Sequence, residues 1–154
     1  MSQDDAGIHL ETSLGYLLKE ASSALRASME AVLRPLGMTV THYSCLELLA
    51  QRPGLSNSEL ARGAFVTRQS MNVLLQALER DGSVTRATAA PVGKALPTSL
   101  TPRGRRSLEK ASAAVRSVEE TMLSGMSEAE REGALRALRS MVRALRADFD
   151  TRTP

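Results

Sequence analysis

The chain has 154 residues and a formal net charge of +3; 42% of its residues are hydrophobic and 3% are aromatic. This length suits one domain that buries its own core, and Cys45, the only cysteine, excludes an internal disulfide framework and a multi-cysteine zinc site. No apolar run approaches the ~20 residues that span a bilayer, and the polar, acidic residues 1–7 lack a signal-peptide pattern, so we expect a soluble, cytoplasmic protein with no membrane partner.

Two helices are predicted before residue 52. The first runs from about Ile8 to Leu33, because apolar residues recur there at three- and four-residue steps, and Pro35 and Gly37 end it. The second follows Thr39 or Thr41, either of which could cap its first turn. Its apolar face consists of Cys45, Leu46 and Leu49.

A helix–turn–helix is predicted next. Ser56 and Glu59 have the spacing of a capping box at the start of a short helix, which Gly63 and the β-branched Val66 interrupt. Thr67 then caps a second helix, Arg68 to about Arg80, which ends at Asp81-Gly82. A tight turn containing glycine between two helices is typical of this motif.

The helix from Arg68 has two different faces. Its apolar side consists of Met71, Leu74, Leu75 and Leu78. The other side carries side chains that can hydrogen-bond to base edges and phosphates: Arg68, Gln69, Ser70, Asn72, Gln76 and Arg80. On an isolated helix such a face would be read as solvated surface, but the preceding helix and turn favour DNA recognition.

Two short strands and two long helices complete the chain. Segments 83–86 and 97–101 have extended character, and the loop from Ala87 to Leu96 between them predicts a β-hairpin, or wing. A helix begins at Thr101-Pro102 and continues toward Gly125, and Ser127 and Glu130 form a second capping box. The last helix carries a narrow apolar seam: Leu135, Leu138, Val142, Leu145 and Phe149.

The positive charge is concentrated in the middle of the chain. Residues 1–59 carry −3, residues 60–110 carry +6 from nine basic and three acidic side chains, and residues 111–154 are neutral. Seventeen of the 20 basic residues are arginine, whose planar guanidinium suits phosphate and guanine, although a GC-rich genome also favours arginine codons. This asymmetry indicates a surface that binds a polyanion.

Other kinds of site receive little support. His9 and His42 have no carboxylate partner at ligand spacing, and the chain lacks a glycine-rich phosphate loop and a nucleophile motif, so we expect no enzyme activity, metal site or cofactor. We expect Cys45 to be a buried small hydrophobe; a redox sensor is the alternative. Apolar stripes at both ends of a small core indicate homodimerisation.

In sequence, the chain resembles the MarR (multiple antibiotic resistance regulator) family of winged helix–turn–helix regulators over roughly Leu14 to Leu145. The resemblance lies in the order and spacing of several motifs: Gly37-Met38-Thr39-Val40-Thr41, Ser58-Glu59-Leu60-Ala61, Val66-Thr67-Arg68-Gln69-Ser70-Met71-Asn72, Leu78 to Arg86, and Leu100-Thr101-Pro102-Arg103-Gly104. It implies a mainly α fold with a small β-hairpin wing, in one integrated domain: an N-terminal dimerisation helix (1–36), a winged helix–turn–helix (37–101) and C-terminal dimerisation helices (102–154).

The resemblance also implies a function. A homodimer would place one recognition helix per subunit in the major groove of a palindromic site on double-stranded DNA. Arg68, Gln69, Ser70, Asn72 and Gln76 would face the DNA, and Arg86 would brace the base of the wing. Many members are repressors that a small phenolic or anionic ligand releases from DNA.

The wing departs from the family pattern. Family members commonly carry an Asp-x-Arg pair there, whose arginine enters the minor groove, but residues 90–95 read Ala-Pro-Val-Gly-Lys-Ala. Lys94 is the only charged candidate at the tip, and lysine fits a narrow minor groove less well than arginine. We therefore expect Lys94 to contact phosphate, and the sequence leaves base reading by the wing open.

The effector site is the least defined part of this interpretation. Tyr16, His42 and Tyr43 lie in the first two helices, which border the effector pocket of the family, so they are candidate polar anchors in a largely aliphatic site for a small aromatic or anionic molecule. They could equally be surface residues. Two alternatives remain for the whole protein: a helical adaptor whose winged helix binds protein, and a DNA-binding regulator that needs no ligand.

Overall fold

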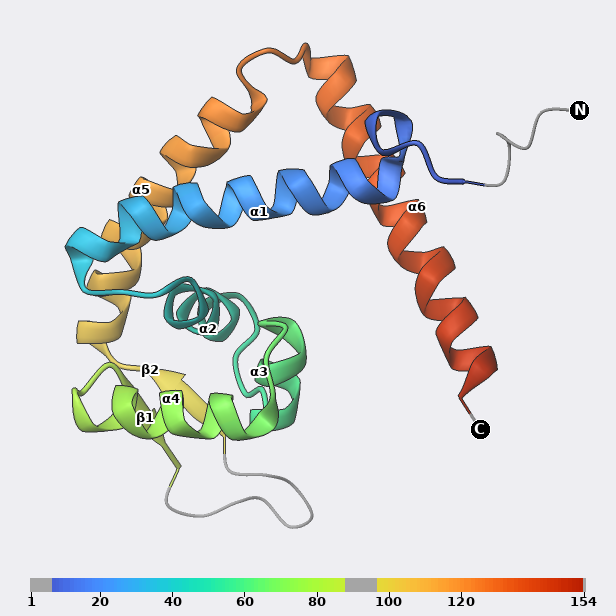
Figure 1. Cartoon of the computed structure of the whole chain (residues 1–154). Helices are drawn as coiled ribbons and strands as arrows, with labels where there is room; N and C mark the ends of the chain where they lie inside the picture. Colours follow the sequence, from blue (N-terminus) through green and yellow to red (C-terminus); the bar gives the residue numbers. More distant parts are fainter. Residues whose placement is uncertain (1–6, 88–96, 154) are drawn as a thin grey trace, which may run out of the picture. The chain divides into compact units, whose positions relative to one another are not determined.

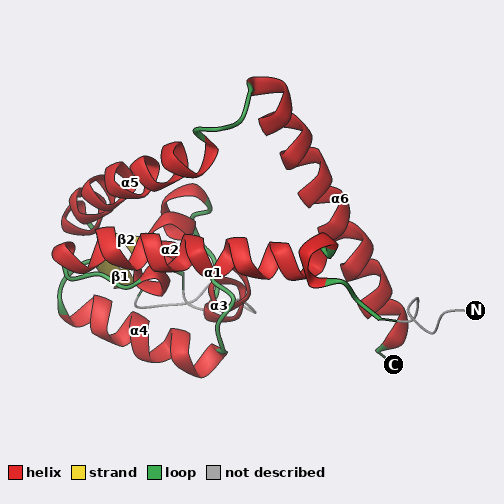
Figure 2. Ribbon diagram, turned by 45° about the horizontal axis from the view of Figure 1, so that its top comes forward, coloured by secondary structure: helices red, strands yellow, loops and turns green. Residues whose placement is uncertain are grey.

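A computed structural model describes residues 7–87 and 97–153. They form six α-helices and one two-stranded antiparallel sheet, as predicted. The chain divides into two compact units, 1–118 and 119–154, and the boundary falls inside α5. Figure 1 gives the element labels and Figure 2 the distribution of helix, strand and loop.

The first long helix of this unit, α1 (Leu14–Leu33), begins six residues later than the sequence predicted. A short 3-10 helix (Leu10–Thr12) precedes α1, and the extended backbone of Ser13 separates the two. The Ser13 hydroxyl accepts a hydrogen bond from the backbone N–H of Tyr16, 3.2 Å away, and so caps α1. The apolar periodicity of the sequence continues upstream of Ser13. The periodicity therefore predicted a start for α1 that is too early.

Helices α2, α3 and α4 begin at the predicted caps. Thr39, rather than Thr41, caps α2 (Val40–Gln51). Ser56 and Glu59 form the predicted capping box of α3 (Asn57–Gly63), and Thr67 caps α4 (Arg68–Arg80). Each cap satisfies backbone N–H groups that have no partner within the helix. The sequence therefore determined these starts through local hydrogen bonds.

The two strands are three residues each, and β1 (Val84–Arg86) pairs with β2 (Thr98–Leu100). In the antiparallel register, Val84 lies opposite Leu100 and Arg86 opposite Thr98. Residues 88–96 of the predicted wing, including Lys94 and the segment without an Asp-x-Arg pair, lie outside the described residues.

Helix α5 (Pro102–Leu123) starts against the end of the helix–turn–helix. The Thr101 hydroxyl accepts a hydrogen bond from the Gly104 N–H at 3.1 Å and donates one to the Gly82 carbonyl. A Cβ atom on Gly104 would lie 2.1 Å from the carbonyl oxygen of Ser83. This close approach explains why glycine stands at the end of the Leu100–Gly104 motif.

The core of the first unit lies between α1, α2, α3, α4, the two strands and α5. It is almost entirely aliphatic, and its fully buried members include Leu33, Cys45, Leu46, Leu60, Met71, Leu75 and Ala111. Cys45 is therefore part of the core, as expected. Because Met71, Leu75 and Leu78 anchor α4 in this core, the opposite face of α4 is held toward solvent.

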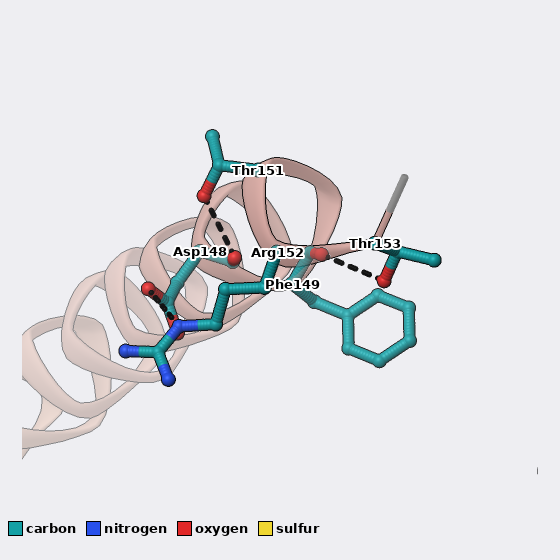
Figure 3. Close-up of polar contacts among 5 residues, drawn as sticks. All are labelled: Asp148, Phe149, Thr151, Arg152 and Thr153. Atoms are coloured by element: carbon teal, nitrogen blue, oxygen red, sulfur yellow. Dashed lines mark hydrogen bonds and ion pairs between the residues drawn. The ribbon is translucent and has the colours of Figure 1, made fainter.

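The second unit contains the last turn of α5 and all of α6 (Glu128–Arg152). Ser127 and Glu130 form the predicted capping box at the start of α6. Near its end, the Arg152 side chain pairs with Asp148 at 3.0 Å, and the Thr151 and Thr153 hydroxyls donate to backbone carbonyls one helical turn back (Figure 3). The predicted seam of α6, from Leu135 to Phe149, is exposed along its length.

Candidate nucleic-acid interface

Helices α3 and α4 form a helix–turn–helix, in which α3 packs directly on α4 (Figure 1). The turn between them is closed by a hydrogen bond from the Val66 N–H to the Ala61 carbonyl at 3.0 Å. Phe65, in this turn, has a left-handed backbone with φ of 59° and a side chain that is 88% exposed. A bulky residue rarely adopts this conformation, and the turn requires it here.

The predicted DNA-facing side chains of α4 are all exposed. Arg68, Gln69, Ser70, Asn72 and Gln76 lie outside the core, while Met71, Leu75 and Leu78 are buried. Ser70 takes part in the local cap, since its hydroxyl accepts a hydrogen bond from the Thr67 hydroxyl at 2.9 Å. The structure therefore brings together one polar face with several donors and acceptors on a rigid helix.

Asn72 is linked to the first helix of the motif. The side-chain amide of Asn57, in the first turn of α3, donates a hydrogen bond to the side-chain carbonyl of Asn72. This contact turns Asn72 toward α3 and uses one acceptor position on its amide. The NH2 group of Asn72 keeps its capacity to donate to a phosphate or a base acceptor.

Arg86 lies at the base of the hairpin and faces α4. Its Nε is 3.5 Å from Oε2 of Glu79, and the Arg86 side chain is 25% exposed. The ion pair joins β1 to the recognition-helix candidate. This geometry matches a bracing residue better than one that extends freely toward a ligand.

Sequence reasoning missed one residue on this face. Val73 is 61% exposed, although it is the only β-branched aliphatic residue of α4. Only hydrogen-bonding side chains on this helix were predicted from the sequence as DNA contacts, and Val73 was therefore not among them. Its position four residues after Gln69 and three before Gln76 is the signal that could have identified it.

One of the three candidate effector residues lines a pocket among the described residues. A pocket of about 210 Å³ lies beside α2 and the end of α3, and of the three only Tyr43 lines it. Its other lining residues are mostly polar: Ser44, Glu47, Leu48, Gln51, Arg52 and Gly63. Tyr16 is an exposed residue of α1. The expectation of a largely aliphatic site does not describe this pocket.

Glu47, which lines the pocket, and His42, which belongs to the same helix, have specific surroundings. The Glu47 carboxylate accepts hydrogen bonds from the Ser112 hydroxyl at 3.0 Å and from the Gln51 amide. His42 is half-buried, and burial lowers the pKa of its imidazole more than the nearby Asp81 carboxylate raises it. Its Nε2 atom is buried and has no hydrogen-bond partner among the described residues.

Burial also defines the chemistry of Cys45. Because its thiol lies in the aliphatic core, desolvation raises the pKa of Cys45 to about 12. A thiol with this pKa is almost entirely protonated at neutral pH, and the thiolate is the reactive form. The environment is that of a structural cysteine.

Residues 7–87 and 97–153 contain neither a membrane-spanning helix nor a cluster of metal ligands. No helix there is long and apolar enough to cross a membrane. Within the same residues, no three His, Cys, Asp or Glu side chains are grouped in a way that could hold a metal ion.

Comparison with known proteins agrees with the helix–turn–helix geometry. A family model described as the MarR family matches residues 36–95. The HTH-type transcriptional repressor Rv2887 of Mycobacterium tuberculosis is 44% identical over 117 residues, which are 76% of this chain and 84% of the repressor.

Solved structures of the same repressor have the same fold. Its complex with salicylic acid matches with a TM-score of 0.70 and 40% identity, covering 84% of this chain and 96% of that one. Its complex with DNA matches with a TM-score of 0.68 and 38% identity, covering 84% and 98%. The sequence likeness, the fold and the exposed face of α4 together lead to one conclusion: the chain belongs to the MarR family.

Proposed function

We propose that this protein is a transcriptional repressor that binds a palindromic DNA site as a homodimer in the cytoplasm. The observation that carries the proposal is the division of α4 into a buried apolar face and an exposed polar face within a helix–turn–helix. An α-helix fits the major groove of B-DNA, where base edges differ in their donors and acceptors. The relative Rv2887 is a repressor and has been crystallised with DNA.

The DNA contacts are assigned to three groups of side chains. Arg68, Gln69, Ser70, Asn72 and Gln76 of α4 face the major groove. Lys94 contacts a phosphate from the wing. Arg86 braces the base of the wing against α4. Its ion pair with Glu79, at 3.5 Å, supports this role.

The dimer is assigned to the two ends of the chain. In the first unit, α1 exposes Leu14, Leu17 and Leu18, and in the second, α6 exposes Leu138 and Val142. Large apolar side chains exposed in rows on two helices are typical of a surface that another chain covers. Two copies double the number of contacts to a palindromic site.

A small aromatic or anionic effector would release the repressor from DNA. The relative Rv2887 has been crystallised with salicylic acid, which is both aromatic and anionic. In this chain, the pocket beside α2 offers the guanidinium of Arg52 for a carboxylate and the ring of Tyr43 for an aromatic group. MarR-family transcriptional regulators are not enzymes, and we assign this chain no catalytic activity.

Selection of bound duplexes from a random DNA pool, followed by titration at several salt concentrations, tests this function. We expect an enriched palindrome and an affinity that falls steeply with salt, because arginine contacts displace counterions from the phosphates. Salicylate should then weaken binding of the selected duplex. A chain that enriches no sequence and remains monomeric by analytical ultracentrifugation contradicts the proposal.

A further inference from the structure

Val73 lies on the exposed face of α4. Gln69, Val73, Gln76 and Arg80 follow one another at steps of four, three and four residues. At 3.6 residues per turn these four side chains fall within about 60° of the helix circumference. They lie opposite Met71, Leu75 and Leu78, which are buried. We refer to these four residues as the outer stripe of α4.

Asn72 does not belong to the outer stripe. It lies to one side of it, toward α3, where its carbonyl accepts the hydrogen bond from Asn57. The residues that project most directly from the protein are therefore two glutamines, one arginine and one valine. Val73 is 61% exposed, so its isopropyl group faces solvent beside the polar side chains of this stripe.

The surroundings of Val73 favour DNA over a protein as the group that covers it. Arg68 and Arg80 stand at the two ends of α4, and residues 60–110 carry a net charge of +6. The exposed apolar surface of α4 itself is one valine beside the small Ala77, and the exposed Phe65 lies outside this helix, in the turn before it. Specific protein interfaces bury about 800 Å² per partner, far more than this strip offers. A polyanion that displays a small apolar group matches both the positive charge around α4 and the small size of the apolar surface at Val73.

The C5-methyl group of thymine is an apolar group of this size on a polyanion. It is displayed in the major groove, where it distinguishes T·A from the other base pairs, and aliphatic side chains contact it. A valine side chain has no donor or acceptor, so it cannot read any other base-edge feature. We infer that Val73 contacts a thymine methyl group and determines the preference for thymine at one position of each half-site. The inference rests on the proposed DNA-binding function.

Replacement of single thymines by deoxyuridine tests this contact, because it removes the methyl group and leaves base pairing unchanged. The duplex is the one selected from the random pool by the wild-type dimer, and each thymine is replaced in turn, symmetrically in both half-sites. We expect one position at which wild-type affinity falls about fourfold per half-site, the value for removing one buried methyl group. The Val73→Ala variant should bind the thymine duplex as weakly as the wild type binds the deoxyuridine duplex. Its own affinity should not change when that thymine is replaced by deoxyuridine.

Two variants serve as controls. Gln76→Ala removes a neighbouring side chain of the outer stripe, and it should lose affinity by the same factor on the thymine and deoxyuridine duplexes. Val73→Thr keeps the branched shape and one methyl group, so it should retain part of the preference. Because Val73 is exposed on a helix and alanine is a good helix former, Val73→Ala should keep its helical circular dichroism.

The outcomes separate this inference from the proposed function. If the wild type binds every deoxyuridine duplex as tightly as the parent, DNA binding stands and the Val73 contact is wrong. If Val73→Ala still responds to deoxyuridine at the sensitive position, another side chain reads the methyl group, and the inference is again overturned. If no duplex is enriched at all, both the function and the inference fail.

Discussion

Arg86 in β1 and Glu79 in α4 form an ion pair, with Nε of Arg86 3.5 Å from Oε2 of Glu79. The pair joins the hairpin to the helix that we assign to DNA reading. The Arg86 side chain is 25% exposed and the Glu79 side chain 50% exposed, so solvent partly screens the pair. Its main effect would then be on the orientation of the hairpin rather than on stability.

Replacement of this arginine distinguishes a brace from a phosphate contact. Arg86→Met keeps most of the aliphatic stem and removes the charge. We expect the free energy of unfolding to fall by about 1 kcal/mol or less and DNA affinity to fall several-fold, because the hairpin loses its tie to α4. The slope of log affinity against log salt should not change. A slope reduced by about one per subunit would show that Arg86 contacts a phosphate.

Gly104 tests the packing between α5 and the end of the helix–turn–helix. In Gly104→Ala, the new Cβ would meet the Ser83 carbonyl oxygen at 2.1 Å, so the backbone must shift. We expect a loss of about 1–3 kcal/mol in the free energy of unfolding, as for overpacked sites, measured by urea denaturation. Gly125→Ala is the matched control, because a Cβ there meets nothing within 4 Å. Equal stability of the two variants would argue against the close approach.

Cys45 should be insensitive to oxidants in the folded protein. Its buried thiol has a pKa of about 12, so the reactive thiolate is scarce at neutral pH. We expect peroxide to leave DNA binding unchanged and a thiol reagent to react only when the protein unfolds. Peroxide that releases DNA from the wild type but not from Cys45→Ser would establish a redox sensor.

The same thiol predicts a change of stability at high pH. The unfolded thiol ionises near pH 9 and the folded thiol near pH 12, so the folded state retains its proton over this range. Stability is therefore fully present below about pH 9 and declines as the pH rises toward 12. Cys45→Ala lacks this component, and urea titrations at pH 7.5 and 10 should show a smaller decline for the variant than for the wild type.

His42 predicts the opposite dependence at low pH. Burial lowers the pKa of its imidazole in the folded protein, so the unfolded chain binds the proton more tightly. The stability contributed by the neutral imidazole is present above about pH 6.5 and is lost as the pH falls through the lower folded value. In urea titrations at pH 7.5 and 5.5, His42→Gln should lose less stability on acidification than the wild type. Equal losses would contradict the effect.

Features set by short stretches of sequence were predictable. The Ser56–Glu59 and Ser127–Glu130 capping boxes involve residues three positions apart, and both formed as expected. The start of α1 was misplaced because the apolar periodicity runs across the break at Ser13. Local patterns thus predict helix identity well and helix boundaries less well.

Contacts between distant residues were not predictable from pattern alone. Asn57 and Asn72 are fifteen residues apart and meet only because α3 packs on α4. Val73 was overlooked because hydrogen-bonding residue types guided the choice of DNA contacts, although its spacing from Gln69 and Gln76 places it on the same face and its side chain is exposed. Tyr16, His42 and Tyr43 were grouped by sequence position, whereas the pocket beside α2 includes Tyr43 alone among them.

Affinity for the selected palindrome, compared between the wild type and recognition-helix variants, tests the central claim most directly. Arg68→Ala and Gln69→Ala should each weaken binding by about 1–3 kcal/mol if they read bases, whereas Arg116→Ala, an exposed arginine on α5, should bind within twofold of the wild type. Wild-type affinity in both α4 variants would contradict the assignment of α4 as the helix that reads DNA.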